Sequence, residues 1–135
     1  MAIIFREFYK PYYEEKRDGL HHPFSLLCFL KEANTVSTKL ENQFQAKLIK
    51  ELHARFNPCV VMKLDSGYIQ GIPDLIILRS GKWATLECKR SSTAPFRPNQ
   101  ETYNEKLNGM SFSRVIFPEN KEAILDELTD FLRDV

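Results

Sequence analysis

Two short apolar runs separated by a tight turn constrain this chain more than any other feature of its sequence. The runs cover residues 72–78 and 83–89, and Ser80-Gly81-Lys82 stands between them. Short apolar segments bounded by turn residues are typical of β-strands, and a glycine-containing turn of this length joins antiparallel neighbours. The sequence therefore predicts a β-hairpin whose first strand begins close to the place where its second strand ends.

The segments around this hairpin predict an α/β fold. Apolar residues recur every fourth position from Leu40 to Phe56, which is the pattern of an amphipathic helix. Residues 59–64 and 114–117 read as strands. Helices are expected at 38–56, which ends at Asn57-Pro58, at 98–108, which ends at Gly109, and at 119–132. A helix separates the last strand from the hairpin, so the economical topology is a mixed β-sheet flanked by helices in the order αβββαβ and then α.

The length and composition fit one soluble domain with a short extension. The chain has 135 residues, of which 43% are hydrophobic, and no apolar run approaches the roughly 18 residues that a membrane-spanning helix needs. The first residues lack the pattern of an export signal. Cys28, Cys59 and Cys88 are scattered without a C-x-x-C pair, which indicates reduced thiols. We therefore expect a cytoplasmic protein with no membrane partner.

Residues 1–34 differ from the rest of the chain in being rich in aromatic side chains. The aromatic residues at positions 5–13 follow helical spacing, which Pro11 interrupts, and a second apolar run covers residues 24–30. This pattern predicts an N-terminal extension of two short helices that pack on the domain formed by residues 35–135. The alternative is an arm that binds a substrate or a second copy, and we expect a homodimer with residues 1–33 in its interface.

The charged residues are unevenly distributed, although the formal net charge is only +1. Residues 79–114 carry seven basic and three acidic side chains, whereas residues 119–135 carry two basic and six acidic ones. A near-neutral chain can therefore present a basic face to an anionic partner. Solvated surface explains the same asymmetry.

Three charged residues lie where the two hairpin strands meet. Asp74 stands near the start of the first strand, and Glu87 and Lys89 end the second. Residues two apart on a strand face the same side, and the hairpin brings Asp74 beside them. Charges among apolar strands are costly unless they are compensated. A divalent cation held by the two carboxylates would compensate them, and oxygen ligands favour Mg²⁺ or Mn²⁺. In the alternative, Glu87 and Lys89 form an edge-strand ion pair and Asp74 caps a turn.

The pattern resembles the PD-(D/E)xK nuclease superfamily, most closely its VRR-NUC and small phage-type members. The resemblance covers roughly residues 38–127 and rests on four ordered elements. These are Gly71-Ile72-Pro73-Asp74-Leu75, Glu87-Cys88-Lys89-Arg90, Pro98-Asn99-Gln100 and Leu107-Asn108-Gly109. It implies a restriction-endonuclease-like core and metal-dependent hydrolysis of DNA, in the cytoplasm of a bacterial cell or a phage-infected host.

The resemblance also implies roles for individual residues. Asp74 and Glu87 would be ligands of Mg²⁺, for which Mn²⁺ can substitute, and the Cys88 carbonyl would complete the site. Lys89 would orient the attacking water or stabilise charge on the phosphate. Gln100 would organise the site, or be an exposed residue of a first helical turn. Glu41 would be a further ligand, or the last residue of a Thr38-x-x-Glu41 capping box.

The expected partner is DNA, and the expected substrate is branched, such as a Holliday junction or a flap. We expect contacts to DNA from Lys63, Ser66, Arg90 and Arg97, although an ordinary polar turn explains the first two equally well. The small relatives that act on junctions are the source of the substrate expectation, which is analogy. The alternative function is a catalytically silent DNA-binding or assembly module that retains the nuclease fold.

Overall fold

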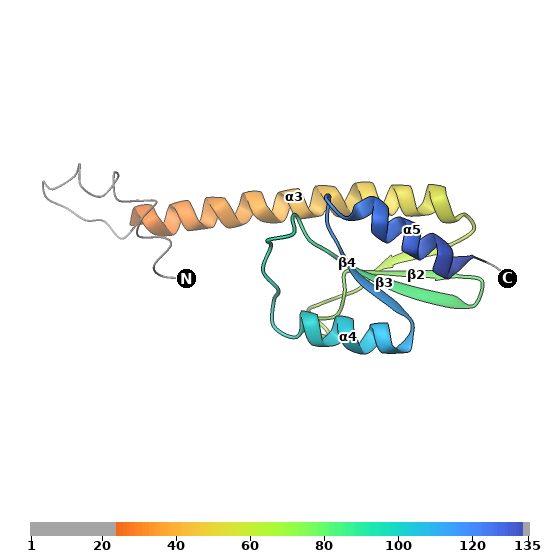
Figure 1. The fold of residues 1–135 in the computed structure, drawn as a ribbon. Helices are drawn as coiled ribbons and strands as arrows, with labels where there is room; N and C mark the ends of the chain where they lie inside the picture. The colour runs from red at the N-terminus through yellow and green to blue at the C-terminus, as the bar shows by residue number, and fades with distance from the viewer. Residues whose placement is uncertain (1–23, 134–135) are drawn as a thin grey trace, which may run out of the picture. The chain divides into compact units, whose positions relative to one another are not determined.

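The structure, a computed structural model, describes residues 24–133. The chain divides into two compact units, Met1–Asn34 and Thr35–Val135, and the first is described only from residue 24, where it is helical. The elements are α3 (Phe24–Phe56), β1 (Val60–Lys63), β2 (Leu75–Arg79), β3 (Lys82–Cys88), α4 (Gln100–Met110), β4 (Phe112–Ile116) and α5 (Lys121–Leu132) (Figure 1).

The four strands form one mixed sheet in the order β1-β2-β3-β4. β1 pairs with β2 and β2 with β3 in antiparallel fashion, whereas β3 and β4 are parallel. Parallel neighbours need a crossover connection, and α4 supplies it. The predicted α/β fold with a mixed sheet is therefore confirmed, and β3 lies inside the sheet with a partner on each side.

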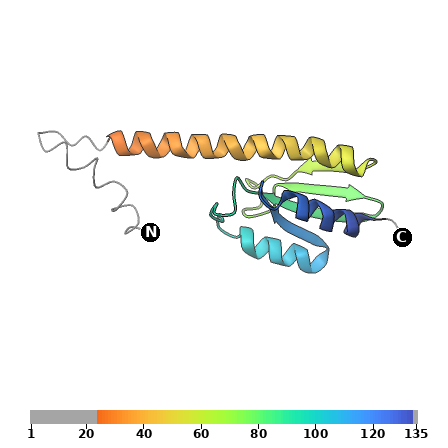
Figure 2. The ribbon, with the colours of Figure 1, turned by 45° about the horizontal axis from the view of Figure 1, so that its top comes forward.

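Helices cover both faces of this sheet. The part of α3 in the second unit and α5 lie on one face, and α4 lies on the other (Figures 1 and 2). On the α4 side the sheet carries polar groups: the Thr85 hydroxyl donates to the Ser113 hydroxyl at 2.8 Å, which in turn donates to Asn104 Oδ1 at 2.7 Å. The apolar core lies on the opposite face, so the two faces of the sheet differ in chemistry.

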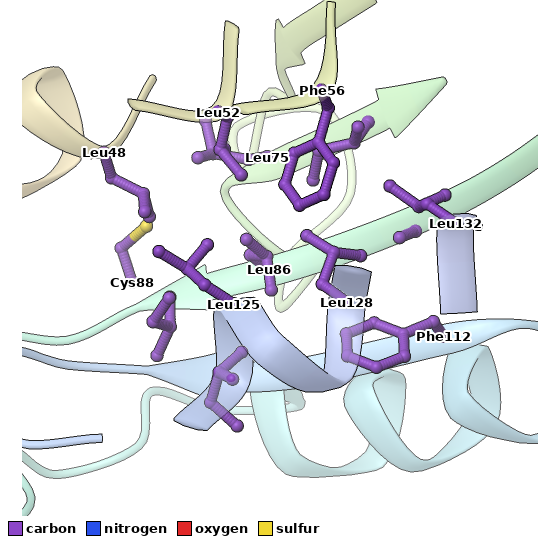
Figure 3. Close-up of a cluster of buried hydrophobic side chains, with 14 residues drawn as sticks. Leu48, Leu52, Phe56, Leu75, Leu86, Cys88, Phe112, Leu125, Leu128 and Leu132 are labelled. Atoms are coloured by element: carbon purple, nitrogen blue, oxygen red, sulfur yellow. The ribbon is translucent and has the colours of Figure 1, made fainter. Parts of the chain in front are cut away.

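The core is formed by buried aliphatic and aromatic side chains from α3, α5 and the sheet. Side chains of α3 and α5 point toward those of β2 and β3 (Figure 3). Leu52, Leu75 and Leu86 are fully buried. Alternation along β3 places Ala84, Leu86 and Cys88 in this core, so Thr85 and Glu87 point to the other face.

The predicted start of the first helix is wrong. α3 begins at Phe24 and runs without a break to Phe56, so Thr38 lies inside the helix and the predicted capping box does not exist. Residues 31–37 contain no proline or glycine, and nothing in them ends a helix. The predicted end before Asn57-Pro58 is confirmed. The fourfold spacing is confirmed at Leu48, Leu52 and Phe56, which are buried.

Several other predicted boundaries shift by a few residues. β2 begins at Leu75, so Asp74 precedes the strand. Gly109 lies within α4 and does not cap it, because the helix continues to Met110. Pro98 lies before this helix because Asn99 adopts a left-handed backbone conformation with φ 67°, which delays the helical geometry until Gln100.

The structure tests the predictions for residues 1–33 only in part, because it describes the chain from residue 24. The predicted helix at residues 24–30 belongs to α3. The aromatic segment at positions 5–13 lies outside the described residues, and the homodimer stays a prediction. None of the helices within residues 24–133 combines the length and the hydropathy needed to cross a bilayer.

Replacing Leu52 tests the contribution of α3 to the core. Leu52 is fully buried, whereas Leu40, three turns earlier on the same helix, is 51% exposed. We expect Leu52→Ala to lower the free energy of unfolding by about 2–5 kcal/mol, because it leaves a cavity among packed side chains. Leu40→Ala, the matched control, should change it by less than about 0.5 kcal/mol. Urea denaturation measures both, and equal effects would contradict this description of the core.

Candidate active site

The hairpin register brings Asp74 and Glu87 together. Leu75 pairs with Leu86, so the next positions outward, Asp74 and Glu87, lie opposite each other across the two strands. Asp74 Oδ2 accepts a hydrogen bond of 2.8 Å from the backbone N–H of Cys88. The carboxylate of Asp74 is therefore fixed against the end of β3. The alternative interpretation, in which Asp74 caps a turn, is not what the structure shows.

Glu87 is a buried carboxylate in the interior of the sheet. Its side chain is 2% exposed, and one oxygen, Oε1, accepts a hydrogen bond of 2.5 Å from Gln100 Nε2. The other oxygen, Oε2, is buried and has no hydrogen-bond partner in the part of the chain that the structure describes. An unpaired buried carboxylate oxygen is costly, and such groups are rare in folded proteins.

Lys89 supplies positive charge beside this carboxylate. Its Nζ lies 3.3 Å from Glu87 Oε1 and donates hydrogen bonds to Gln100 Oε1 at 2.6 Å and to the Pro95 carbonyl at 3.3 Å. The residue is only 4% exposed. Glu87 and Lys89 do form an ion pair, as the alternative interpretation expected, but not on an edge strand, because β3 has a neighbour on each side and both side chains are buried.

Gln100 joins the two charged groups. It is the first residue of α4 and is 7% exposed, so the interpretation as an exposed residue of a first turn is wrong. Its Oε1 accepts from Lys89 Nζ and, at 2.7 Å, from the backbone N–H of Arg97, while its Nε2 donates to Glu87. An amide has both a donor and an acceptor end, and here each end meets the opposite partner.

Burial raises the pKa of both carboxyl groups. The pKa of Glu87 rises to about 7, first because burial disfavours the charged form and then because of the negative charge of Asp74, while Lys89 opposes the rise. Burial also raises the pKa of Asp74, and the Cys88 N–H opposes it. Two close carboxyl groups in a poorly solvated place favour either a proton or a cation between them.

Glu41 reaches the same end of the sheet from α3. Its carboxylate lies 3.8 Å from the Arg97 guanidinium, and its charge contributes to raising the pKa of Glu87. Gln45, one turn later and buried, hydrogen-bonds the Cys88 side chain. Sequence reasoning missed Gln45, although its spacing of four from Glu41 places both on one helical face and could have identified it.

The donor set fits a hard divalent cation with few protein ligands. Among the described residues, no group of three or more His, Cys, Asp or Glu side chains is arranged to hold a metal ion, and the role of Glu41 as a further ligand stays a prediction. Mg²⁺ is commonly bound through one or two carboxylates, with water and substrate phosphate filling other positions. The orphaned Glu87 Oε2 and the adjacent Asp74 match this requirement. The role of the Cys88 carbonyl stays a prediction.

A pocket of about 240 Å³ opens beside Asp74. One wall is the segment from Ser66 to Asp74, and the other is the segment that leads into α4. Its lining residues are Ser66, Gln70, Gly71, Ile72, Asp74, Arg97, Pro98 and Gln100. Sequence reasoning missed Gln70, because a single polar residue in a loop carries no pattern of its own.

Gly71 lets the two walls of this pocket pack closely against each other. It has φ +91°, and a Cβ at this position would lie 2.6 Å from the backbone carbon of Asn99. Only glycine adopts this conformation readily and also permits so close an approach. The glycine in the Gly71-Ile72-Pro73-Asp74 motif therefore lets the first wall pack against the residue that precedes α4.

The four residues expected to contact DNA are all exposed, but they differ in position. Ser66 and Arg97 line the pocket. Lys63 does not, yet its charge acts on Asp74, as does that of Arg97. Arg90 follows Lys89 in sequence and is exposed, outside the pocket lining. The structure thus brings two of the four to the pocket and one near it.

Comparisons with protein families, with curated proteins and with solved structures found no match for this chain.

The raised pKa of Glu87 predicts how stability depends on pH without a metal. In the unfolded chain the pKa returns to about 4.5, so between pH 4.5 and about 7 the folded state binds more protons than the unfolded state. The free energy of unfolding should therefore fall as the pH rises, by about 3 kcal/mol over this interval. Glu87→Gln, which cannot ionise, should lack this loss.

Urea denaturation of both proteins in EDTA from pH 4.5 to 8 measures the difference. Adding Mg²⁺ at pH 8 should restore much of the lost stability to the wild type and little to Glu87→Gln, since only a bound cation compensates the ionised pair. Parallel pH curves for the two proteins would show that Glu87 is not the buried acid described above.

Proposed function

We propose that the protein is a metal-dependent endonuclease that hydrolyses phosphodiester bonds in DNA. The observation that carries this proposal is the buried Glu87 carboxylate beside a second carboxylate, Asp74; within residues 24–133 its Oε2 has no hydrogen-bond partner. A cation held between this oxygen and Asp74 would satisfy it. The order of Pro73-Asp74, Glu87-Cys88-Lys89 and Gln100 along the chain resembles the PD-(D/E)xK pattern.

Asp74 and Glu87 would hold Mg²⁺, with the Cys88 carbonyl as the expected third protein ligand. When bound, the metal lowers the pKa of a coordinated water and neutralises charge on the scissile phosphate. The chain holds Asp74 ready for this through the Cys88 N–H and holds Glu87 through Gln100. Ligands fixed in this way need little rearrangement when the cation arrives.

Lys89 would act on the substrate side of the carboxylates. Its ammonium is held by Gln100 and Pro95, so its position does not depend on Glu87 alone. A fixed positive charge there would orient the attacking water or stabilise charge that develops on the phosphate. Gln100 is then a positioning residue, because it acts through Glu87 and Lys89.

The pocket and its exposed cation support an anionic substrate. Arg97 lines the pocket with Asp74, and its side chain is 64% exposed. Its guanidinium can therefore approach a phosphate from the open side of the pocket. Branched DNA remains the expected substrate, and the homodimer remains the expected way to make paired cuts, since this domain provides one such site per chain.

Removing either carboxylate tests the site directly. We expect Asp74→Asn and Glu87→Gln each to lower the Mg²⁺-dependent nicking of supercoiled plasmid by at least about 100-fold, because the cation loses a ligand. Binding of DNA in EDTA should persist, since phosphate affinity comes from Lys and Arg. Glu101→Gln, which changes an exposed carboxylate in the first turn of α4, is the matched control and should cut normally.

Full activity in either site variant would contradict the assignment of the metal ligands. A wild-type protein that binds DNA but does not cut plasmid, flap or four-way substrates with Mg²⁺ or Mn²⁺ would favour the silent module instead. Both outcomes are read from gel assays of cleavage and from anisotropy assays of binding.

Lys89 and its neighbour Arg90 form a second matched pair. We expect Lys89→Arg to lower kcat by at least about 100-fold, because a planar guanidinium cannot reproduce the bonds of a compact ammonium to Gln100 and Pro95. Metal binding, followed by calorimetry, should persist. Arg90→Ala should instead raise KM with little change in kcat, as expected for an exposed phosphate contact. If Lys89→Arg cuts at the wild-type rate, the lysine has only a structural role.

A further inference from the structure

Two exposed aromatic rings flank the pocket. Tyr68 is 86% exposed, and it stands between Ser66 and Gln70, which both line the first wall. Phe96 is 47% exposed and directly precedes Arg97 on the second wall. Neither ring belongs to the apolar core. Each ring is thus a close sequence neighbour of residues that line one wall of the polar pocket.

Both rings stand on ordered backbone. The turn under Tyr68 is held by Asp65, whose carbonyl accepts from the backbone N–H groups of Tyr68 and Ile69 at 3.1 and 3.2 Å. The Asp65 carboxylate also accepts from the Gly67 N–H at 2.7 Å. The backbone on either side of Phe96 is held by two hydrogen bonds, from Lys89 Nζ to the Pro95 carbonyl and from the Arg97 N–H to Gln100 Oε1. The Lys89 ammonium also lies 5.3 Å from the centre of the Phe96 ring. Little conformational freedom of the backbone would therefore be lost if a ligand stacked on these rings.

Cations lie beside the rings, as they do in proteins that bind single-stranded nucleic acid. Arg97 lines the pocket itself, and the charge of Lys63 acts on Asp74 within it. Single-strand binding combines basic side chains, which follow the phosphates, with aromatic rings, on which successive bases stack. In a duplex the faces of the bases are covered by their neighbours, so a protein ring stacks readily only on an unpaired base.

We propose that Tyr68 and Phe96 stack on unpaired bases of a DNA strand whose phosphate is held in the pocket by Arg97 and Ser66. This inference rests on the proposed function for the identity of the polymer, and it narrows the substrate to DNA with unpaired nucleotides at the cleavage site. The two rings hold the bases on either side of the pocket, and Asp74, which lines the pocket, faces the phosphate between them.

The test measures binding without metal, so no cleavage occurs. The probes are a fluorescent dT oligomer, an abasic oligomer of equal length and a duplex, titrated in EDTA. Tyr68→Leu should weaken binding to the dT oligomer by roughly 5- to 150-fold, since it loses one stacked base. Tyr68→Phe keeps the ring and should bind within about twofold of the wild type, and Phe96→Leu should weaken binding as Tyr68→Leu does.

Neither leucine variant should alter binding to the abasic oligomer or to the duplex, because these probes offer phosphates without an accessible base face. Met110→Leu, an exposed residue at the last position of α4, is the control for surface changes. Wild-type binding of the dT oligomer by Tyr68→Leu, equal weakening on the abasic probe, or no binding of the dT oligomer by the wild type would each overturn the inference. Because the assay is free of metal, failure of the nuclease proposal, seen as full cleavage by Asp74→Asn, is detected separately.

Discussion

The buried carboxylate of Glu87 is the constraint on which the rest of the site depends. It lies in β3, an interior strand, where water cannot satisfy it, so the chain has to bring compensating groups to it. Gln100 comes from α4 and Lys89 from the end of the same strand, and together they satisfy only one of its two oxygens. Because the second oxygen stays unsatisfied, the carboxylate favours binding of a proton or a cation. The raised pKa and the metal proposal therefore have the same physical origin.

The crossover through α4 explains how these groups reach one place. Because β4 is parallel to β3, the chain has to travel back along the sheet, and α4 begins at the end of β3 that carries Glu87. The left-handed Asn99 turns the chain into this helix, and Gly71 packs against Asn99 so closely that a side chain would not fit. The motif glycine therefore has a mechanical function: it sets the distance between the loop that carries Asp74 and the helix that carries Gln100.

Sequence reasoning predicted this site better than it predicted the helices. Asp74, Glu87 and Lys89 could be placed together because a hairpin has a period of two and a short turn, which leave little freedom of register. The start of α3 was predicted too late, because Thr38 and Glu41 form a local capping pattern, whereas residues 31–37 contain no helix-ending residue and the helix continues through them. Gln70 went unnoticed because a single amide in a loop has no periodic signal, whereas Gln45 shares a helical face with Glu41 and could have been identified from that spacing.

The net charge of the chain does not indicate how much positive charge its surface can offer to an anionic partner. The formal net charge of +1 counts Lys89. This lysine is buried, pairs with Glu87 and donates a hydrogen bond to Gln100, so its charge contributes little to the exposed surface. Arg97 is partly paired with Glu41, yet it remains exposed at the pocket. Affinity for a polyanion would therefore rest on a few cations and has to be supplemented by contacts that do not depend on charge. The exposed rings of Tyr68 and Phe96 are the contacts proposed for this purpose, and stacking on them would respond to the pairing state of the bases, which phosphate contacts alone cannot distinguish.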